Sequence, residues 1–305
     1  MKRRGILVVG SANMDLVLRA RRFPAPGETI FGEGFDMHPG GKGANQAVCA
    51  AKLGGNVRFV GKVGRDIFGG DLTRGMRRDG VRLEHLLLDS SAPTGTALIV
   101  VDGKGQNEIV VISGSNMNLA PGDIRRASRA FDGAGVLLLQ LEVPLETVAA
   151  AAAIARRRGI TVLLNPAPAR ALPRTLLSLV DYLTPNETEL GQLAGLSVTG
   201  LPSAVRAARA LLERGVKGVV VTLGSRGALY VDRETFRRYT APRVKPVDTT
   251  AAGDAFNGAL AFALAGGRAL PEAIPFANAV AALSVTRPGA QGSMPTMRDV
   301  RAFSD

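Results

Sequence analysis

The stretch from residue 136 to residue 164, VLLLQLEVPLETVAAAAAIARRRGITVLL, contains the pattern that decides the fold. It begins with a nearly continuous apolar run at Val136–Leu141, continues as an alanine-rich segment at Leu145–Arg157, and ends in a second apolar run at Ile160–Leu164. Strands that are apolar along their whole length are covered on both faces, and two such strands joined by a helix pair in parallel. The stretch therefore predicts a β-α-β unit within a parallel sheet.

The same alternation of short apolar runs and helical patterns continues on both sides of this unit. Further strands are expected at Ile6–Val9, Val57–Val60, Tyr182–Thr184, Val219–Leu223 and Ala228–Val231. Further helices are expected at Gly43–Leu53, Ile67–Arg78, Ala204–Arg214, Ala252–Leu264 and Pro271–Val285. The predicted fold class is α/β, with a mostly parallel sheet between two helical layers.

Two segments depart from this alternation of strands and helices, Leu16–Phe35 and Thr94–Ile112, and their alternating apolar and polar residues predict strands. Antiparallel hairpins inserted into such a domain usually lie apart from the main sheet. We expect them to form a small β-sheet lid, built from residues 14–38 and 94–112, over the carboxyl ends of the strands where ligands bind.

Composition excludes several classes of protein. The 38 basic and 26 acidic residues leave a net charge of +12, but the arginines are scattered, aromatic residues are 5% of the chain, and tryptophan is absent. This favours a solvated basic surface over a nucleic-acid site. No apolar stretch approaches the roughly 18 residues of a membrane span. The single thiol, Cys49, cannot form an internal disulfide and fits a reducing cytoplasm.

The first of two glycine-rich segments is PGGKGANQA at residues 39–47. Glycines at the start of a helix leave backbone N–H groups exposed and let a ligand approach the chain closely. Asn45 would lie one turn into that helix. A plain turn into a helix explains the segment equally well. The usual P-loop and dinucleotide-binding signatures do not occur in the chain.

The second segment is VDTTAAGDAFNG at residues 247–258. Small residues precede an apolar helix, so the N–H groups of Ala251, Ala252 and Gly253 would be unpaired at its positive end and could hold a phosphoryl group. Asp254 would lie beside them, stay ionised there, and accept a proton from a substrate hydroxyl. The alternative is an acidic residue that caps a first turn.

Two polar residues, Asn13 and Asp15, follow the first strand, where a ligand-facing loop is expected. An aspartate and an asparagine together can bind vicinal hydroxyls. A surface turn is the alternative explanation.

Six segments taken together resemble the ribokinase family of sugar and nucleoside kinases, the PfkB carbohydrate kinases. They are Gly10–Asp15, Gly40–Ala47, Leu164–Ala169, Thr184–Glu189, Thr222–Gly227 and Asp248–Gly258. Each is weak evidence alone, but their order and spacing match the family over nearly the whole chain. The resemblance implies one kinase domain over residues 1–305, with the two hairpins as its substrate lid.

The resemblance also implies an activity, transfer of the γ-phosphate of ATP to O5 of D-ribose to give D-ribose 5-phosphate and ADP. Asp254 matches the general base, and the amides of Ala251, Ala252 and Gly253 match the anion hole. The positions that match sugar contacts are Asn13, Asp15, Gly41, Lys42, Asn45, Glu142 and Asp254. The positions that match ATP contacts are Asn186, Thr222, Gly224, Ser225, Gly227, Gly253 and Asn278.

Metals and partners are likewise implied by the resemblance. Asn186 and Glu189 form the family's N-x-x-E motif, which helps to organise Mg²⁺ and its waters. The positions that match the activating potassium site are Asp248, Thr250, Ser284, Arg287, Gly289 and Ser293. The family also suggests a cytoplasmic homodimer that associates through the lid.

Alternatives remain within and outside this family. The same machinery could phosphorylate deoxyribose, a ketose, a keto-acid sugar or a nucleoside such as adenosine, although the small aliphatic lid around Ala97 and Ile109 favours a bare pentose. A sugar sensor that has lost catalysis is a second class. The intact Asp254, Gly253 and N-x-x-E motif argue against it.

Overall fold

The structure is a computed structural model that describes residues 4–304; the ends of the expected domain, residues 1–3 and 305, lie outside it. Nine strands of the described chain form the central sheet. They are β1 (Gly5–Val9), β4 (Val57–Gly64), β5 (Arg82–Asp89), β8 (Ala134–Leu139), β9 (Thr161–Leu164), β10 (Tyr182–Leu183), β11 (Gly218–Thr222), β12 (Ala228–Val231) and β13 (Phe236–Tyr239). Their order is β13-β12-β11-β10-β9-β8-β1-β4-β5. The pairs β11–β12 and β12–β13 at one edge are antiparallel, so β12 alone runs against the other strands.

Side chains of the central strands alternate between two apolar cores. In β1, Ile6 and Val8 pack into one core and Leu7 and Val9 into the other, and all four are at most 2% exposed. This double burial explains why the strand reads as a continuous apolar run.

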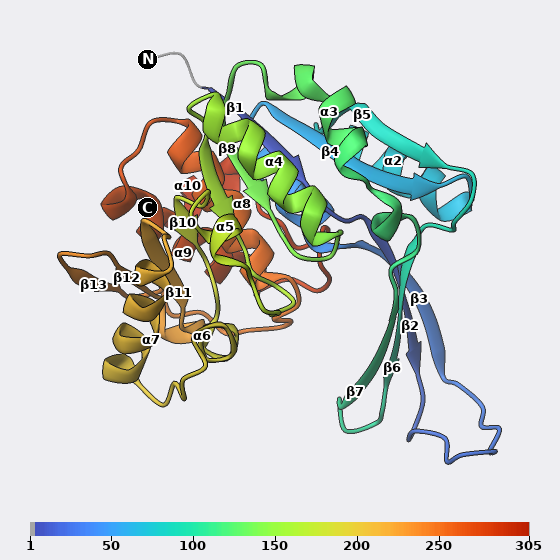
Figure 1. Ribbon diagram of the computed structural model, residues 1–305. Helices are drawn as coiled ribbons and strands as arrows, with labels where there is room; N and C mark the ends of the chain where they lie inside the picture. The colour runs from blue at the N-terminus through green and yellow to red at the C-terminus, as the bar shows by residue number, and fades with distance from the viewer. Residues whose placement is uncertain (1–3, 305) are drawn as a thin grey trace.

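One helix layer covers each face of the sheet. The first core is covered by α1 (Lys42–Lys52), α2 (Ile67–Arg78), α8 (Ala252–Ala265), α9 (Leu270–Ser284) and α10 (Met297–Ser304). The second is covered by α3 (Pro121–Arg126), α4 (Leu145–Arg157), α5 (Arg174–Leu177), α6 (Glu187–Ala194) and α7 (Leu201–Glu213). The layers appear in Figure 1, with α4 and α5 in front of the sheet and α8 and α9 behind it. The predicted three-layer α/β fold is confirmed.

A second sheet of four strands projects from the body (Figure 1). Its strands are β2 (Asn13–Arg19), β3 (Gly34–Gly40), β6 (Gly95–Val101) and β7 (Asn107–Ile112), in the order β3-β2-β6-β7. Each outer pair is an antiparallel hairpin, as expected, but the central pair β2–β6 is parallel. Both of these strands leave the body in the same direction, with Asn13 opposite Gly95 at the base.

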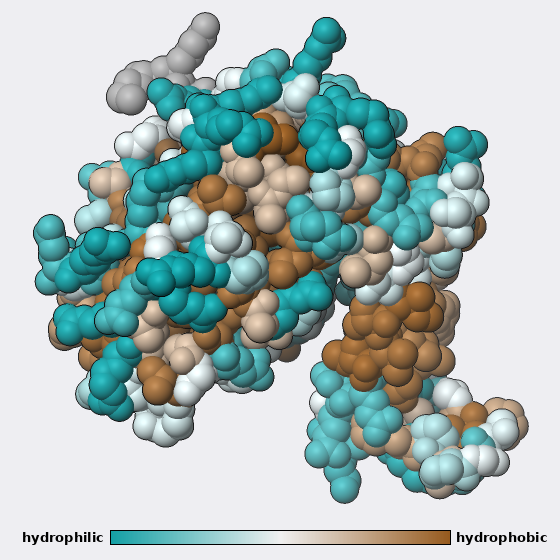
Figure 2. Space-filling view, in the orientation of Figure 1, coloured by the Kyte–Doolittle hydropathy of each residue, from teal (hydrophilic) through white to brown (hydrophobic). Residues whose placement is uncertain are grey.

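Apolar side chains are exposed along this second sheet. Ile109, Val110, Val111 and Ile112 of β7 are each between 53% and 60% exposed. Figure 2 shows the corresponding apolar surface on the arm that carries the sheet.

Within residues 4–304, no helix combines the length and hydropathy that crossing a membrane would require.

Candidate active site

A cavity of about 410 Å³ lies between the carboxyl ends of the central strands, the start of α8 and the second sheet. Most residues singled out from the sequence line it. These are Asn13, Asp15, Gly41, Lys42, Asn45, Glu142, Asn186, Glu189, Thr222, Thr250, Ala251, Ala252, Gly253 and Asp254. The parallel topology explains the convergence, because loops that follow parallel strands meet at one edge of the sheet.

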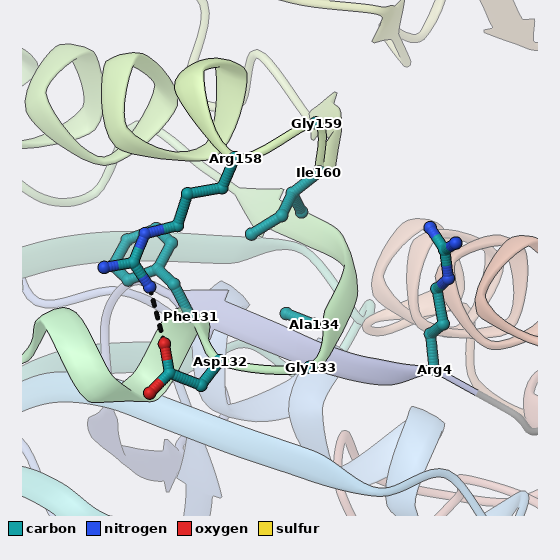
Figure 3. Close-up of a pocket in the computed structure, with 8 residues that line it drawn as sticks. All are labelled: Arg4, Phe131, Asp132, Gly133, Ala134, Arg158, Gly159 and Ile160. Carbon is teal, nitrogen blue, oxygen red and sulfur yellow. Dashed lines mark hydrogen bonds and ion pairs between the residues drawn. The ribbon is translucent and has the colours of Figure 1, made fainter.

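Another pocket, of about 400 Å³, lies at the opposite end of the sheet (Figure 3). Arg158 donates to the Asp132 carboxylate there over 2.8 Å and stacks on the Phe131 ring. The charges of Arg158 and Asp132 are therefore already paired with each other. The groups suited to chemistry converge in the first cavity.

Helix α8 begins with a strained residue at the cavity. Its N-cap, Ala251, has φ 58° and ψ 17°, and it is the only non-glycine residue with positive φ in the described chain. An L-residue in this conformation costs about 1–2 kcal/mol, and such strain often occurs at functional sites. Within residues 4–304 the amides of Ala251 and Gly253 have no hydrogen-bond acceptor. The Ala252 amide differs from the prediction, because it faces the Thr249 carbonyl at 3.3 Å.

Asp254 lies at the third position of α8 and is 6% exposed. Its Oδ2 accepts from Asn45 Nδ2 at 3.0 Å and its Oδ1 from Gln46 Nε2 at 2.9 Å. Burial raises the pKa of Asp254 above its usual range, against the lowering effects of the Lys42 ammonium and the two amides. The sequence predicts that the helix terminus favours the ionised form of this carboxyl; in the structure desolvation acts against that effect and sets the direction of the pKa shift. A raised pKa suits a base that works near neutral pH.

Lys42 is the cation at the centre of this acidic cluster. Its burial disfavours the charged ammonium, but the carboxylates of Asp254, Glu142, Glu189 and Asp15 raise the pKa of Lys42 above its ordinary value. The Lys42 ammonium is therefore held in its charged form among these carboxylates. Such a cation can stabilise negative charge on a transferring phosphoryl group.

Two glycines allow the start of α1 to approach the second sheet. A Cβ on Gly41, whose φ is +85°, would lie 2.7 Å from the Asn13 nitrogen. A Cβ on Gly40 would lie 2.2 Å from Asp15 Oδ2. The segment is therefore more than a plain turn, since it brings Lys42 and Asn45 within the same cavity as Asn13 and Asp15.

Sequence reasoning missed several polar residues around the site. Asn116 Nδ2 donates to Asn13 Oδ1 over 2.7 Å, and its Oδ1 accepts from the Ala12 amide at 3.0 Å. Asn165, Thr184 and Asn257 also line the cavity. Asn116 belongs to an isolated 3-10 turn, Gly114–Asn118, with no recognisable motif around it. Asn165, Thr184 and Asn257 lie within the quoted family segments, which were the only signal for them.

The N-x-x-E motif forms a capping box at the start of α6. Asn186 Oδ1 accepts from the Glu189 amide at 2.8 Å, and Glu189 Oε2 accepts from the Asn186 amide at 2.9 Å. Both residues line the cavity, so the capping role leaves the second Glu189 oxygen available. No cluster of three or more potential side-chain metal ligands occurs among the described His, Cys, Asp and Glu residues. One carboxylate with phosphates and waters nevertheless fits the coordination that Mg²⁺ adopts.

The other predicted nucleotide positions lie outside the cavity lining. Gly224 and Ser225 belong to a 3-10 turn after β11, and Gly227 ends it. Asn278 is buried in α9, and its Nδ2 donates to the carbonyls of Tyr239 and Thr240 at 3.2 and 3.3 Å. In this structure its amide therefore holds the end of β13.

Five of the six predicted potassium positions lie on the loop before α8 and the loop after α9, and Ser284 is the last residue of α9. Val247 and Asp248 donate from their amides to the Val285 carbonyl, which joins the loop before α8 to the end of α9. The Asp248 carboxylate accepts from the amides of Thr250 and Gly289, each at 2.8 Å. Asp248 thus acts here as a brace between the loops.

Asp15 provides a pH prediction. Burial, with the nearby carboxylates Glu142 and Asp254, raises the pKa of Asp15 to about 7. Because the folded state holds this proton more tightly than the unfolded state, stability should fall as pH rises from about 4 to about 7. We expect Asp15→Asn to match the parent near pH 4 and to exceed it above pH 7, by up to about 4 kcal/mol in free energy of unfolding.

Urea denaturation of the ligand-free protein at pH 4, 5.5, 7 and 8.5 measures this difference. Asp71→Asn, on the exposed side of α2, is the matched control. Parallel stability curves for the parent and Asp15→Asn would contradict the assigned pKa.

Comparisons with known proteins agree with this site and fold. A family model described as pfkB family carbohydrate kinase matches residues 3–297, and the chain belongs to this family. It is therefore a phosphotransferase that acts on an alcohol group. A ribokinase from Haemophilus influenzae is 41% identical over 301 residues, covering 99% of this chain and 98% of that protein. A deoxyribokinase from Salmonella typhi is 39% identical over 299 residues, covering 98% of both. The structure of Arabidopsis thaliana ribokinase complexed with ribose and ATP has a TM-score of 0.95 at 35% identity, covering 98% of both chains.

Proposed function

We propose that this kinase transfers the γ-phosphate of ATP to O5 of D-ribose, with Asp254 as general base. The observation that carries the proposal is the placement of Asp254, buried at the start of α8, in one cavity with Lys42, Asn13 and Asp15. The ribokinases among the relatives, at about 40% identity over nearly the full length, support ribose as the acceptor.

The mechanism combines positioning with electrostatic stabilisation. Asn13 and Asp15 bind sugar hydroxyls and direct the 5-hydroxyl toward Asp254, which removes its proton as the oxygen attacks phosphorus. The free amides of Ala251 and Gly253, with the Lys42 ammonium, stabilise the charge on the phosphoryl oxygens. Loss of a single donor of this kind typically costs ~3–4 kcal/mol of transition-state stabilisation.

Two cations belong to this proposal. Mg²⁺, when bound to the ATP phosphates, neutralises their charge, and Glu189 with Asn186 would hold its waters. A potassium ion would lie between the loop before α8 and the loop after α9, held by Asp248, Thr250 and Gly289 among others. A cation held there would stabilise the loop that leads into the start of α8.

The lid residues that line the cavity favour a small sugar. Ala97, Ile99, Ile109 and Val111 are aliphatic and offer no aromatic surface on which a nucleobase could stack. The deoxyribokinase relative makes 2-deoxyribose the second candidate. Discrimination between these sugars depends on groups that contact the 2-hydroxyl.

A coupled ADP-release assay with MgATP tests the proposal. It compares D-ribose, 2-deoxyribose, fructose and adenosine, each with and without potassium. We expect ribose to give the highest kcat/KM and potassium to increase it. Preference for 2-deoxyribose would replace the acceptor but keep Asp254 as base, whereas no turnover on any acceptor would favour a sugar-binding sensor.

Asn116 gives a separate prediction about sugar affinity. Its donation to Asn13 Oδ1 leaves the Asn13 Nδ2 group directed away from that contact and available to the sugar. We expect Asn116→Ala to raise KM for ribose about 10-fold, as loss of one or two buried hydrogen bonds does, with a smaller effect on KM for ATP.

The control is Asn118→Ala in the same 3-10 turn, because Asn118 donates to Asp89 and lies outside the cavity lining. Equal KM values for ribose in the two variants would argue against positioning of Asn13 by Asn116.

We also propose that the chain forms a homodimer through its second sheet, which acts as the lid. The support is the face of this sheet that lies away from the cavity, where Val110, Ile112, Leu98 and Phe35 are 60%, 56%, 40% and 57% exposed. Sedimentation of the protein at micromolar concentration gives the oligomeric state directly. A monomer with the same apolar surface would contradict this assembly.

For location we propose the cytoplasm. Cys49 is fully buried between α1 and α8, and burial raises the pKa of its thiol to about 12. Such a thiol is unreactive, so a free cysteine here is compatible with a reducing compartment.

A further inference from the structure

A chain of three buried amide side chains, Gln140, Gln46 and Asn165, ends on Asp254, and of these three only Asn165 lines the cavity. Gln140 Nε2 donates to Gln46 Oε1 at 2.5 Å. Gln46 Nε2 donates to Asp254 Oδ1 at 2.9 Å and to Asn165 Oδ1 at 3.1 Å. Asn165 Nδ2 donates to the Thr184 carbonyl at 3.0 Å. Gln46 and Gln140 are completely buried, and neither lines the cavity.

The direction of every hydrogen bond in this chain is fixed from one end. A backbone carbonyl only accepts, so the amide nitrogen of Asn165 must face Thr184 and its oxygen must face Gln46. Gln46 must then present its nitrogen to Asn165, and the same nitrogen donates to Asp254 Oδ1. The remaining Gln46 oxygen accepts from Gln140, which prevents the amide from turning over.

This arrangement distinguishes the two oxygens of Asp254. Oδ1 faces Gln46, which does not contribute to the cavity wall, whereas Oδ2 faces Asn45, which does. The Asn45 Oδ1 atom has no partner among the described residues, although Asn45 is 5% exposed. The cavity side of the carboxylate therefore has one fixed donor and one free acceptor close to it.

We propose that Gln46 is a positioning residue for phosphoryl transfer, which holds Oδ1 of Asp254 so that Oδ2 receives the proton of the sugar hydroxyl. In that step the hydroxyl O–H bond breaks, the Oδ2–H bond forms, and the oxygen's electron pair forms the new bond to phosphorus as ADP leaves. The inference rests on the proposed function, because it takes Asp254 as the base.

Other charged and titratable groups also act on Asp254 and remain in place when Gln46 is changed. They are Lys42 on α1, Asp15 on β2, Glu142 after β8 and Glu189 on α6. The Cys49 thiol on α1 also lies near, but burial raises its pKa to about 12 and it stays neutral over the pH range of the assay. The Gln46 hydrogen bond favours the ionised carboxylate, so its removal should raise the pKa of Asp254. A change in pH profile therefore reports on this contact specifically.

The first test is Gln46→Met, which keeps the side-chain length and removes both amide functions. We expect kcat at pH 7 to fall about 10-fold and the acid limb of the kcat profile to move up by about one pH unit, as for loss of one hydrogen bond to a charged group. KM for ribose should change less than about twofold. The control is Cys49→Ala, which alters the same α1–α8 contact and leaves the hydrogen bonds of Asp254 untouched.

A second variant, Gln140→Met, removes the donor that fixes the Gln46 amide and lies one step further from the base. We expect the same upward move of the acid limb, with a smaller loss of kcat. If thermal unfolding shows that Gln46→Met does not fold, the pH profile of Gln140→Met provides the test of the positioning role instead. An acid limb that stays with the Cys49→Ala control in the folded variant would overturn the inference.

The outcome for Asp254→Asn separates this inference from the proposed function. If Asp254→Asn retains turnover, Asp254 is not the base and the proposed mechanism fails. If Asp254→Asn is inactive while Gln46→Met keeps the kinetics and pH profile of Cys49→Ala, only the positioning role of Gln46 is overturned.

Discussion

Asp254→Asn is expected to give a folded protein that binds ribose and ATP but turns over about 10²–10⁴-fold more slowly, the range for loss of a general base. The asparagine amide cannot accept the proton of the 5-hydroxyl. The fold should tolerate the change, because Asn45 has an unpartnered oxygen and can turn its amide to accept from the new NH₂ group.

The measurement is kcat and KM for ribose by ADP release, with sugar affinity from calorimetry. The control is Asp181→Asn, also a buried carboxylate, whose partners Arg156 and Lys217 lie away from the cavity. It should lower stability and leave kcat close to the parent. Near-normal turnover of Asp254→Asn would remove it from the role of base.

The elements of the fold that could be predicted from the sequence are the buried ones. Strands apolar on both faces and amphipathic helices were found within a few residues, as at Leu145–Arg157, where α4 has the predicted bounds. Edge elements were missed. Strand β5 has the sequence RLEHLLLD, in which only Asp89 is buried, and β13 has the sequence FRRY with three of its four residues exposed. Their strand conformation comes from pairing with a neighbour, which short-range patterns do not encode.

The site residues that could be predicted from the sequence lie within the family segments. Asn13, Lys42, Asn45 and Asp254 were predicted and line one cavity. The direction of the pKa shift of Asp254 could not be predicted, because the burial of this carboxyl depends on how α1 packs on α8. Asn116 was missed for the same reason, since it meets Asn13 across 103 positions of sequence. Residues that act through long-range contacts leave no local signal.

The packing of α1 on α8 gives the second prediction. Gly258, one turn after Asp254, lies where a Cβ would be 2.6 Å from the Gln46 carbonyl oxygen and 2.8 Å from Cys49 Cβ. Real Cβ atoms do not approach so closely, so Gly258→Ala must move α8 away from α1. We expect a loss of about 1–3 kcal/mol in free energy of unfolding, typical of overpacking. The same movement separates Asp254 from Asn45 and Gln46, and a displacement of about 1 Å can cost about 10²-fold in rate.

Urea denaturation and the ADP-release assay measure the two effects on one preparation. The matched control is Gly75→Ala in α2, a buried helical glycine around which a Cβ would meet no atom within 4 Å. That variant should be as stable as the parent, or more stable by up to about 1 kcal/mol, because alanine favours the helix. Its kcat should be unchanged, because α2 contributes no residue to the cavity. If Gly258→Ala behaved like Gly75→Ala, the spacing of α1 and α8 would not control the base, and its orientation would have to come from the amide contacts alone.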